Sequence, residues 1–125
     1  MVLDPEMKHA VIRRTVRKFA EEKLAPAAVE MDETAEFPAR LAKEMAALQY
    51  FGLEIPAAYG GAGLDSVSYA IVIEEISKAS GAMGLCISVH NSVSTFPVYE
   101  FGNEVQRQKV PIFSPLAMGI KKLCL

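Results

Sequence analysis

Few residues of this chain could do chemistry, and most of them lack the partners that chemistry needs. Glu74 and Glu75 are adjacent, and adjacent side chains on a helix point about 100° apart. The two carboxylates therefore cannot act together on one substrate atom, and we expect one to be exposed and the other paired. His9 and His90 have no second ligand at metal-binding spacing, and His90 is expected to be a hydrogen-bonded core residue. We predict no catalytic residue and no metal site.

The thiols and the glycine-rich run carry no stronger signal. Cys86 and Cys124 lie too far apart in the sequence for a disulfide framework or a zinc site. Neither has a nearby acid and histidine that would mark a nucleophile, and reduced thiols fit a cytoplasmic protein, or one of the mitochondrial matrix if the source is eukaryotic. Residues 59–63, YGGAG, lack the GxGxxG spacing and follow no predicted strand. We expect a structural turn there and no cofactor-binding residue.

The most informative stretch contains no acidic residue, lysine or arginine from Ala79 to Tyr99. A chain keeps so long an uncharged stretch where it is buried or faces an apolar ligand. Its length would span a membrane, but its many polar side chains would need partners in lipid and Pro97 interrupts it, so we predict no membrane span. Four residues share one face at helical spacing, and line either an apolar pocket or plain core: Leu85, Cys86, Val89 and Val93.

Helical spacing and capping residues predict six helices. The first starts at Asp4-Pro5, the second begins or kinks at Pro26 and runs to about residue 33, and the third opens at Pro38. Asp65 or Ser66 caps the fourth, Gly81 and Gly84 precede the fifth, and Gly102 ends it in the way a C′ glycine does. Asn103 caps the sixth. Apolar residues expected to point inward are Leu41, Met45, Leu48, Tyr69, Val72, Ile73 and Ile76.

No stretch before residue 110 alternates with a strand period, so the predicted fold is an all-α, up-and-down helical bundle. The 125 residues fit one domain. The net charge is −2, which disfavours nucleic acid as a partner. A basic cluster (Arg13, Arg14, Arg17 and Lys18) could suggest a helix-turn-helix DNA binder. Glu21 and Glu22 follow Arg17 and Lys18 at a spacing of four residues, so a solvated, ion-paired face is the preferred interpretation.

Taken in order, several segments resemble one family. LEIPAAYGGAGLDSVSYAIVIEEIS, then SVHNS, Pro97, FGNE at 101–104 and QRQK at 106–109 resemble the amino-terminal helical domain of flavin-dependent acyl-CoA dehydrogenases. The chain shares the words YAI-x-x-EEIS and SV-x-NS with the short-chain (butyryl-CoA) type. The likeness covers nearly the whole chain, and it is the ordered series, rather than any one word, that is diagnostic.

The resemblance implies an activity for the complete enzyme. A glutamate removes the α-proton of an acyl-CoA thioester, the β-hydrogen leaves as hydride to FAD, and an electron-transferring flavoprotein accepts the electrons. In the family that glutamate lies in a later helical domain, and neither Glu74 nor Glu75 matches it. Most FAD contacts come from a β-domain and the later helical domain, so we expect FAD in the complete enzyme but not tightly bound to this chain alone.

The resemblance also divides the chain and points to a site. Residues 1–119 correspond to the N-terminal α-domain and residues 120–125 to the start of a β-domain, while residues 110–118 depart from the family pattern. By position, the residues that flank the fatty tail of the substrate are Leu85, Cys86 and Val89, with Val93 beyond them. We expect an inactive fragment of a homo-oligomeric enzyme. The alternative is a stand-alone helical interaction module that uses the uncharged helix as a partner groove.

Overall fold

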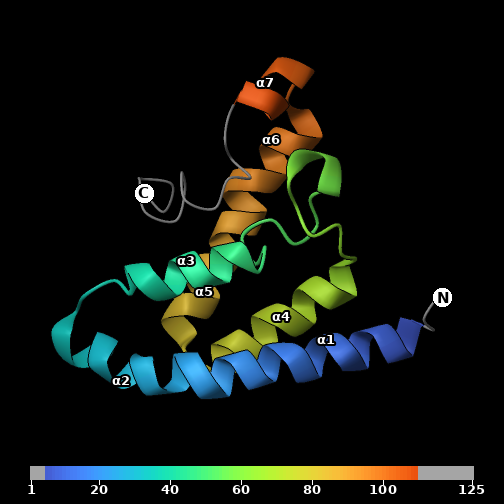
Figure 1. Ribbon diagram of the computed structural model, residues 1–125. Coiled ribbons are helices and arrows are strands. Elements are labelled where there is room, and N and C mark those ends of the chain that lie inside the picture. Colours follow the sequence, from blue (N-terminus) through green and yellow to red (C-terminus); the bar gives the residue numbers. More distant parts are fainter. Residues whose placement is uncertain (1–4, 110–125) are drawn as a thin grey trace.

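The computed structural model describes residues 5–109, and within them the fold is entirely helical. The prediction of an all-α helical bundle is confirmed over that range. α1 (Pro5–Phe19) packs against α4 (Ser66–Ala79), and α4 packs against α5 (Gly81–Val89). A column formed by α5, α6 (Phe96–Phe101) and α7 (Glu104–Lys109) rises from the layer of α1 and α4 (Figure 1). The expected start of a β-domain at 120–125 lies outside the described residues.

α1 continues without a break into a π-helical segment, η1 (Ala20–Leu24), and then into α2 (Ala25–Thr34). Pro26 has no N–H, and in an α-helix its ring would collide with the carbonyl of residue 22. The wider π-helical register ahead of the proline accommodates it. The second helix therefore begins where Pro26 predicted, but as a continuation of the first. It ends at Ala35, whose φ of 55° is left-handed.

α3 (Ala39–Ala47) begins directly after Pro38, as predicted, and buries Leu41 and Met45. The expectation that Leu48 also points inward is wrong, since 47% of it is exposed. α3 ends at Ala47, and Gln49 then adopts a left-handed φ of 63°. The reversal of the chain carries Leu48 away from the buried face.

The glycine-rich run is a structural turn, as predicted. It follows a short 3₁₀ helix, η2 (Ala57–Tyr59), and Gly60 has a φ of 86°, which L-residues rarely adopt. A Cβ at Gly61 would overlap the carbonyl of Ile55. The run packs against its own neighbours and offers no open cradle for a phosphate.

Asp65 caps α4 by accepting the backbone N–H of Ser68 at 2.7 Å, which confirms the predicted start of the fourth helix. Of the residues expected to point inward, Val72 and Ile76 are buried, and Tyr69 and Ile73 are partly buried against the core.

The fifth helix begins earlier than expected. Ser80 caps α5 through the backbone N–H of Met83, so Gly81 and Gly84 lie inside the helix instead of preceding it. A Cβ at Gly84 would overlap the side chain of Ser77. This glycine therefore lets α4 and α5 approach closely.

α5 runs through a second π-helical segment, η3 (His90–Thr95), into α6. Gly102 ends the helix but is extended (φ −75°, ψ 154°), so the expected left-handed C′ conformation is wrong. A Cβ there would overlap the carbonyl of Val98, which accepts the Gly102 N–H and ends the helix. Asn103 and Gln106 exchange side-chain and backbone hydrogen bonds at 2.9 Å, which confirms the predicted cap of the last helix.

Candidate functional site

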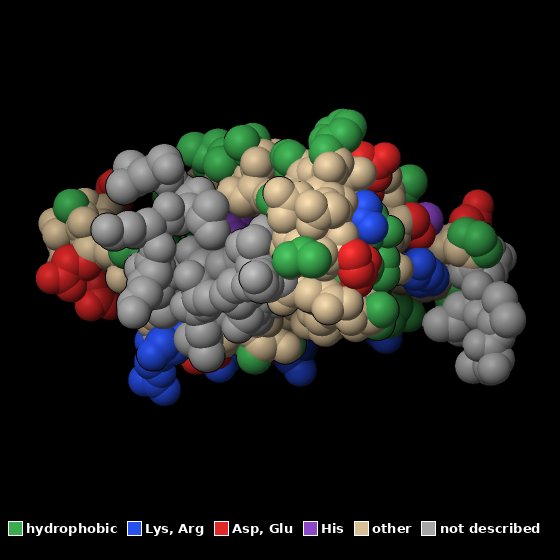
Figure 2. All heavy atoms as spheres, turned by 90° about the horizontal axis from the view of Figure 1, so that it is seen from above, with side chains coloured by type: hydrophobic (Ala, Val, Ile, Leu, Met, Phe, Trp, Pro, Cys, Tyr) green, Lys and Arg blue, Asp and Glu red, His purple; other side chains and the backbone are tan. Residues whose placement is uncertain are grey.

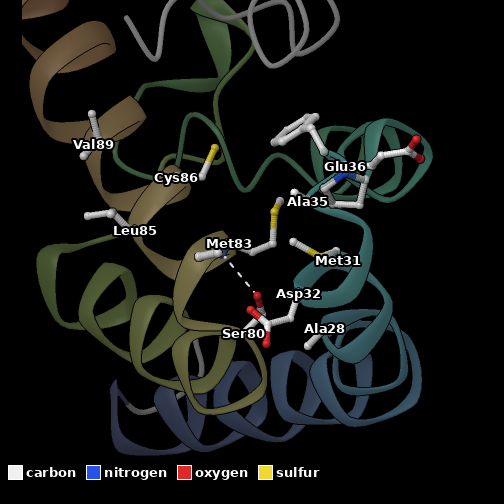
Figure 3. Close-up of a pocket in the computed structure, with 13 residues that line it drawn as sticks. Ala28, Met31, Asp32, Ala35, Glu36, Ser80, Met83, Leu85, Cys86 and Val89 are labelled. Atoms are coloured by element: carbon white, nitrogen blue, oxygen red, sulfur yellow. Dashed lines mark hydrogen bonds between the residues drawn. The ribbon is translucent and has the colours of Figure 1, made fainter.

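A hollow of about 730 Å³ opens between the end of α2, the turn at residues 35–38 and the start of α5. Its wall is mainly apolar (Figure 3). Met31 and Met83 bring thioether sulfurs to it, and a methionine can adapt its shape to an irregular ligand. Asp32 and Glu36 are the acidic residues among its lining. The site can therefore take up an apolar group by exclusion of water, with few polar groups to direct it.

The four residues predicted to share a face divide at this hollow. Leu85, Cys86 and Val89 line it, whereas Val93 lies one turn further along the helix and is not among its lining residues. Leu85 and Val93 are strongly exposed, at 65% and 68%, while Cys86 and Val89 are half-buried. Hydrophobic side chains gather in several patches on the face of the molecule seen from above (Figure 2). The open apolar surface beside the hollow is therefore formed mainly by Leu85 and Val93.

The exposed apolar residues continue beyond the hollow along the same column. Phe96 and Phe101 are 42% and 83% exposed. The opposite side of the column is buried, with Met83 and Ile87 in the core. His90 is also in the core, as expected, and its ring lies edge-on to Phe51 with centroids 5.1 Å apart. The uncharged stretch is thus core on one side and open apolar surface on the other.

The sequence interpretation missed Asn91, which is 6% exposed. Its Oδ1 accepts the Leu53 backbone N–H, and its Nδ2 donates to the carbonyls of Tyr50 and Ile87, each at 2.9 Å. The side chain joins the loop after α3 to the column that carries the hollow. The signal that could have revealed it is an amide within an otherwise uncharged helix, close before Pro97.

The strongest electrostatic cluster lies away from the hollow, between α1 and α4. The Glu75 side chain is 1% exposed. It accepts Arg13 Nη1 at 2.6 Å, Arg17 Nε at 2.9 Å and Lys78 Nζ at 3.2 Å. Glu74 is 48% exposed and pairs with Arg13 and Lys78 as well. One glutamate is exposed and the other is buried and paired, as expected.

Those ion pairs set the pKa of Glu75. The hydrogen bonds from Arg17 lower it most, those from Arg13 and Lys78 add to the effect, and burial opposes them, so that the pKa falls from 4.5 to about 2. A carboxylate held ionised in this way cannot take up a proton near neutral pH. This cluster therefore joins two helices, and it does not form an acid–base site.

Two residues of the basic cluster, Arg13 and Arg17, are paired, but the partner expected for Arg17 is wrong. Arg17 binds Glu75 on α4 instead of Glu21 on its own helix. The π-helical segment η1 contains Glu21 and Glu22, so the i,i+4 geometry of an α-helix is not kept between them and the basic residues. Arg13 and Arg17 tie α1 to α4, which leaves less of the basic cluster for a DNA backbone.

At the other end of α4, Asp65 binds Lys8 Nζ at 3.0 Å and His9 Nε2 at 3.2 Å. The backbone N–H of Ser68, followed by Lys8, lowers the pKa of Asp65 well below its usual range. Over residues 5–109 no group of three or more His, Cys, Asp or Glu side chains could hold a metal ion. None of the helices within that range is long and apolar enough to cross a membrane.

The described residues also supply no set of groups that fits a flavin. The glycine turn is closed by Ile55, and the hollow has an apolar wall without a cluster of donors for a pyrophosphate.

Relatives of known function match most of this chain. Residues 6–113 match the family model described as "Acyl-CoA dehydrogenase, N-terminal domain". An acyl-CoA dehydrogenase of Bacillus subtilis is 47% identical over 102 residues, covering 82% of this chain and 27% of that protein. A short-chain specific acyl-CoA dehydrogenase of Clostridium acetobutylicum is 41% identical over 111 residues, covering 89% of this chain and 29% of that protein.

Three solved structures share the fold. A chain from a structural study of the electron transferring flavoprotein of Acidaminococcus fermentans has a TM-score of 0.83 and 33% identity, covering 93% of this chain and 31% of its own. Butyryl-CoA dehydrogenase from Megasphaera elsdenii has a TM-score of 0.79 and 27% identity, and the match covers 92% of this chain and 31% of that one. An acyl-CoA dehydrogenase from Bacillus anthracis complexed with FAD has a TM-score of 0.78 and 33% identity, and the match covers 91% of this chain and 20% of that one.

The chain thus spans a little under a third of the length of the two curated relatives, and the match lies on one helical domain. The segment resemblances, the all-helical fold and the family match over residues 6–113 agree. This chain belongs to the acyl-CoA dehydrogenase family, as an N-terminal domain.

Proposed function

We propose that this chain is the N-terminal α-domain of a flavin-dependent dehydrogenase that introduces a double bond between the α and β carbons of a short-chain acyl-CoA. Its own contribution is part of the wall of the acyl pocket, formed by Leu85, Cys86, Val89 and Val93. The observation that carries the proposal is the open apolar side of α5 and η3 beside the hollow. The short-chain relatives supply the substrate class.

The wall works by shape and by exclusion of water. An apolar surface against the fatty chain removes both from water, which stabilises the complex by about 25 cal/mol for each Å² buried. The four side chains proposed for this wall are of moderate size and none of the four is aromatic, although Phe37 also lines the hollow. Their bulk fits a short or branched acyl group lying along the helix.

The remaining parts of the reaction lie outside the described residues. FAD would be held by other domains, as in the Bacillus anthracis structure that contains it, and this chain alone is not expected to bind it tightly. An electron-transferring flavoprotein is the proposed electron acceptor, since one is the subject of the Acidaminococcus fermentans study. The catalytic base would also come from another domain, because the Glu75 carboxylate is bound by Arg13, Arg17 and Lys78 and its lowered pKa makes it a weak base. We propose a homo-oligomer for the complete enzyme.

A chimaera tests the activity. This chain replaces the matching segment of the Clostridium acetobutylicum enzyme, to which it is 41% identical. The chimaera should bind FAD and oxidise butyryl-CoA with an artificial electron acceptor, whereas the chain alone should remain colourless and inactive. A folded, flavin-loaded chimaera that oxidises no acyl-CoA would refute the proposed activity.

Two tryptophan variants of the chimaera test the wall. Val89→Trp fills the hollow, while Val67→Trp places the same side chain at a position that is 54% exposed and absent from the hollow. Val89→Trp should lower kcat/KM for hexanoyl-CoA more than for butyryl-CoA, and Val67→Trp should change neither. Equal losses for both substrates in Val89→Trp would show that this residue does not contact the acyl chain.

The second candidate function is a stand-alone helical interaction module. The exposed Phe96 and Phe101 favour it, because they extend the apolar surface past the hollow. A pull-down with the chain that recovers one protein partner, unaffected by added acyl-CoA, would support this function against the first.

A further inference from the structure

The π-helical segment η3 determines which side chains of the long helix face the same way. Leu85 and Val93 are eight residues apart and both strongly exposed, while Ile87 and Thr95 are eight residues apart and both fully buried. In an α-helix, residues eight apart point about 80° away from each other. If one residue is absorbed by a wider turn, the difference falls to about 20°. The close match in exposure within each pair agrees better with a helix that contains the extra residue in η3.

Side chains inside η3 supply donors to the helix backbone. Asn91 Nδ2 donates to the Ile87 carbonyl at 2.9 Å, Ser92 Oγ to Ser88 at 2.7 Å and Thr95 Oγ1 to Asn91 at 3.0 Å. The Asn91 carbonyl also accepts the N–H of Phe96, five residues on, which is the π-helical register. In the wide turn some carbonyls are not well aligned with a backbone N–H, and these side chains give them a second hydrogen-bond donor.

Asn91 differs from the two hydroxyl residues because it also reaches outside the helix. Its amide binds the Tyr50 carbonyl and the Leu53 N–H at 2.9 Å, and both of these residues are buried. The loop after α3 therefore holds this side chain in one orientation. Pro97 is the other element that favours the wide turn, since in an α-helix its ring would collide with the Val93 carbonyl.

We infer that Asn91 is a positioning residue: its side chain holds the π-helical turn and so keeps Val93 in line with Leu85 on the open apolar side. Without the extra residue, Val93 would turn by about 100° toward the hollow. Any effect of Val93 on an acyl ligand rests on the proposed function. The rotation of Val93 does not depend on that function.

A cysteine reporter tests the inference without any acyl ligand. Val93→Cys is introduced into the 125-residue chain with Cys86→Ala and Cys124→Ser, and its reaction with a disulfide reagent such as DTNB is timed under native conditions. Four further chains carry Pro97→Ala, Asn91→Leu, both changes together, or Ser92→Ala. Ser92→Ala is the matched control, because it removes a hydrogen bond of the same segment on the exposed side.

Pro97→Ala and Ser92→Ala should label at the rate of the parent, because Asn91 still holds the turn. The double variant should label severalfold more slowly, since residue 93 rotates toward the hollow, and Asn91→Leu alone should lie between the two. The direction of the change in labelling rate separates the two explanations: a rotation of residue 93 slows labelling, whereas simple loss of structure would speed it. The inference is overturned if Pro97→Ala alone slows labelling as much as the double variant, or if the double variant labels at the parental rate or faster.

Because no acyl-CoA is used, this result is independent of the chimaera. A slowed reporter with an inactive chimaera would overturn the proposed function and keep the positioning role. An unchanged labelling rate with an active chimaera would overturn the positioning role and keep the proposed function.

Discussion

Replacement of Glu75 by glutamine should separate a buried ion pair from an exposed one on the same helix. Glu75 is 1% exposed and its neighbour Glu74 is 48% exposed, yet both bind Arg13 and Lys78. Glutamine keeps the size of the side chain and removes its charge. Glu74→Gln is therefore a matched control for Glu75→Gln.

The expected magnitude follows from the pKa of Glu75. A fall from 4.5 to about 2 corresponds to about 3 kcal/mol of folding free energy, at about 1.4 kcal/mol per pKa unit. Removal of one partner from a buried pair costs about 3–5 kcal/mol. The Arg13 and Arg17 side chains are 36% and 49% exposed, so water can solvate them and the lower end applies. Glu74→Gln should cost far less, because exposed pairs contribute little to stability.

Urea unfolding of the three chains between pH 7 and pH 2 measures this. The native carboxylate of Glu75 has the lower pKa, so its contribution is full above the unfolded pKa of 4.5 and is lost as the pH falls through about 2. The difference between the parent and Glu75→Gln should therefore shrink over that window. Equal losses for the two variants at pH 7, or a difference that stays constant down to pH 2, would refute the reasoning.

Four further variants, one of them a control, test the fold. Asp65→Ala removes the cap of α4 and should lower the urea midpoint of unfolding. An unchanged midpoint would show that this cap does not stabilise the chain. Met45→Ala opens a cavity at a fully buried position and should cost about 2–5 kcal/mol; a loss below this range would mean that the core collapses around it. Gly84→Ala should lower the thermal midpoint because its Cβ would overlap Ser77, whereas Gly81→Ala, with open space around it, should not.

Helix content and most helix starts follow from local residues. Asp65 and Asn103 cap the helices that were assigned to them, since a cap depends on atoms within three residues. The errors at Leu48 and Gly102 concern helix ends. There the direction of the chain depends on a left-handed Gln49 in one case and on an extended backbone in the other, and neither is evident from composition.

The ion pairs show a second limit. The spacing of Arg17 and Glu21 predicts a pair on one helix, whereas Arg17 binds Glu75, 58 residues away along the chain. Arg17 binds the buried Glu75 in preference to the nearby Glu21. A carboxylate that is removed from water needs hydrogen-bond donors more than an exposed carboxylate does. Only the packing of α1 against α4 brings these groups together.

Three apolar residues that line the hollow were predictable from the sequence, whereas its other apolar residues, such as Met31 and Met83, and its polar ones were not. Leu85, Cys86 and Val89 share a face by simple periodicity and do line the hollow. The turn that changes the direction of Val93 required knowledge of η3, which ends two residues before Pro97, as η1 ends two residues before Pro26. A proline within helical periodicity was taken as an interruption, but in both places the helix absorbs it by a wider turn.

This explains what the polar residues of the uncharged stretch do. Asn91, Ser92 and Thr95 donate to carbonyls one turn earlier in the same helix. Their hydrogen-bond donors are therefore already used within the helix, and Asn91 also binds the loop after α3. The surface that the helix offers to a partner is therefore its apolar side, from Leu85 to Val93. Under the proposed function, this domain would contribute to the reaction by shape and by exclusion of water, and the groups that exchange protons and electrons would come from other domains.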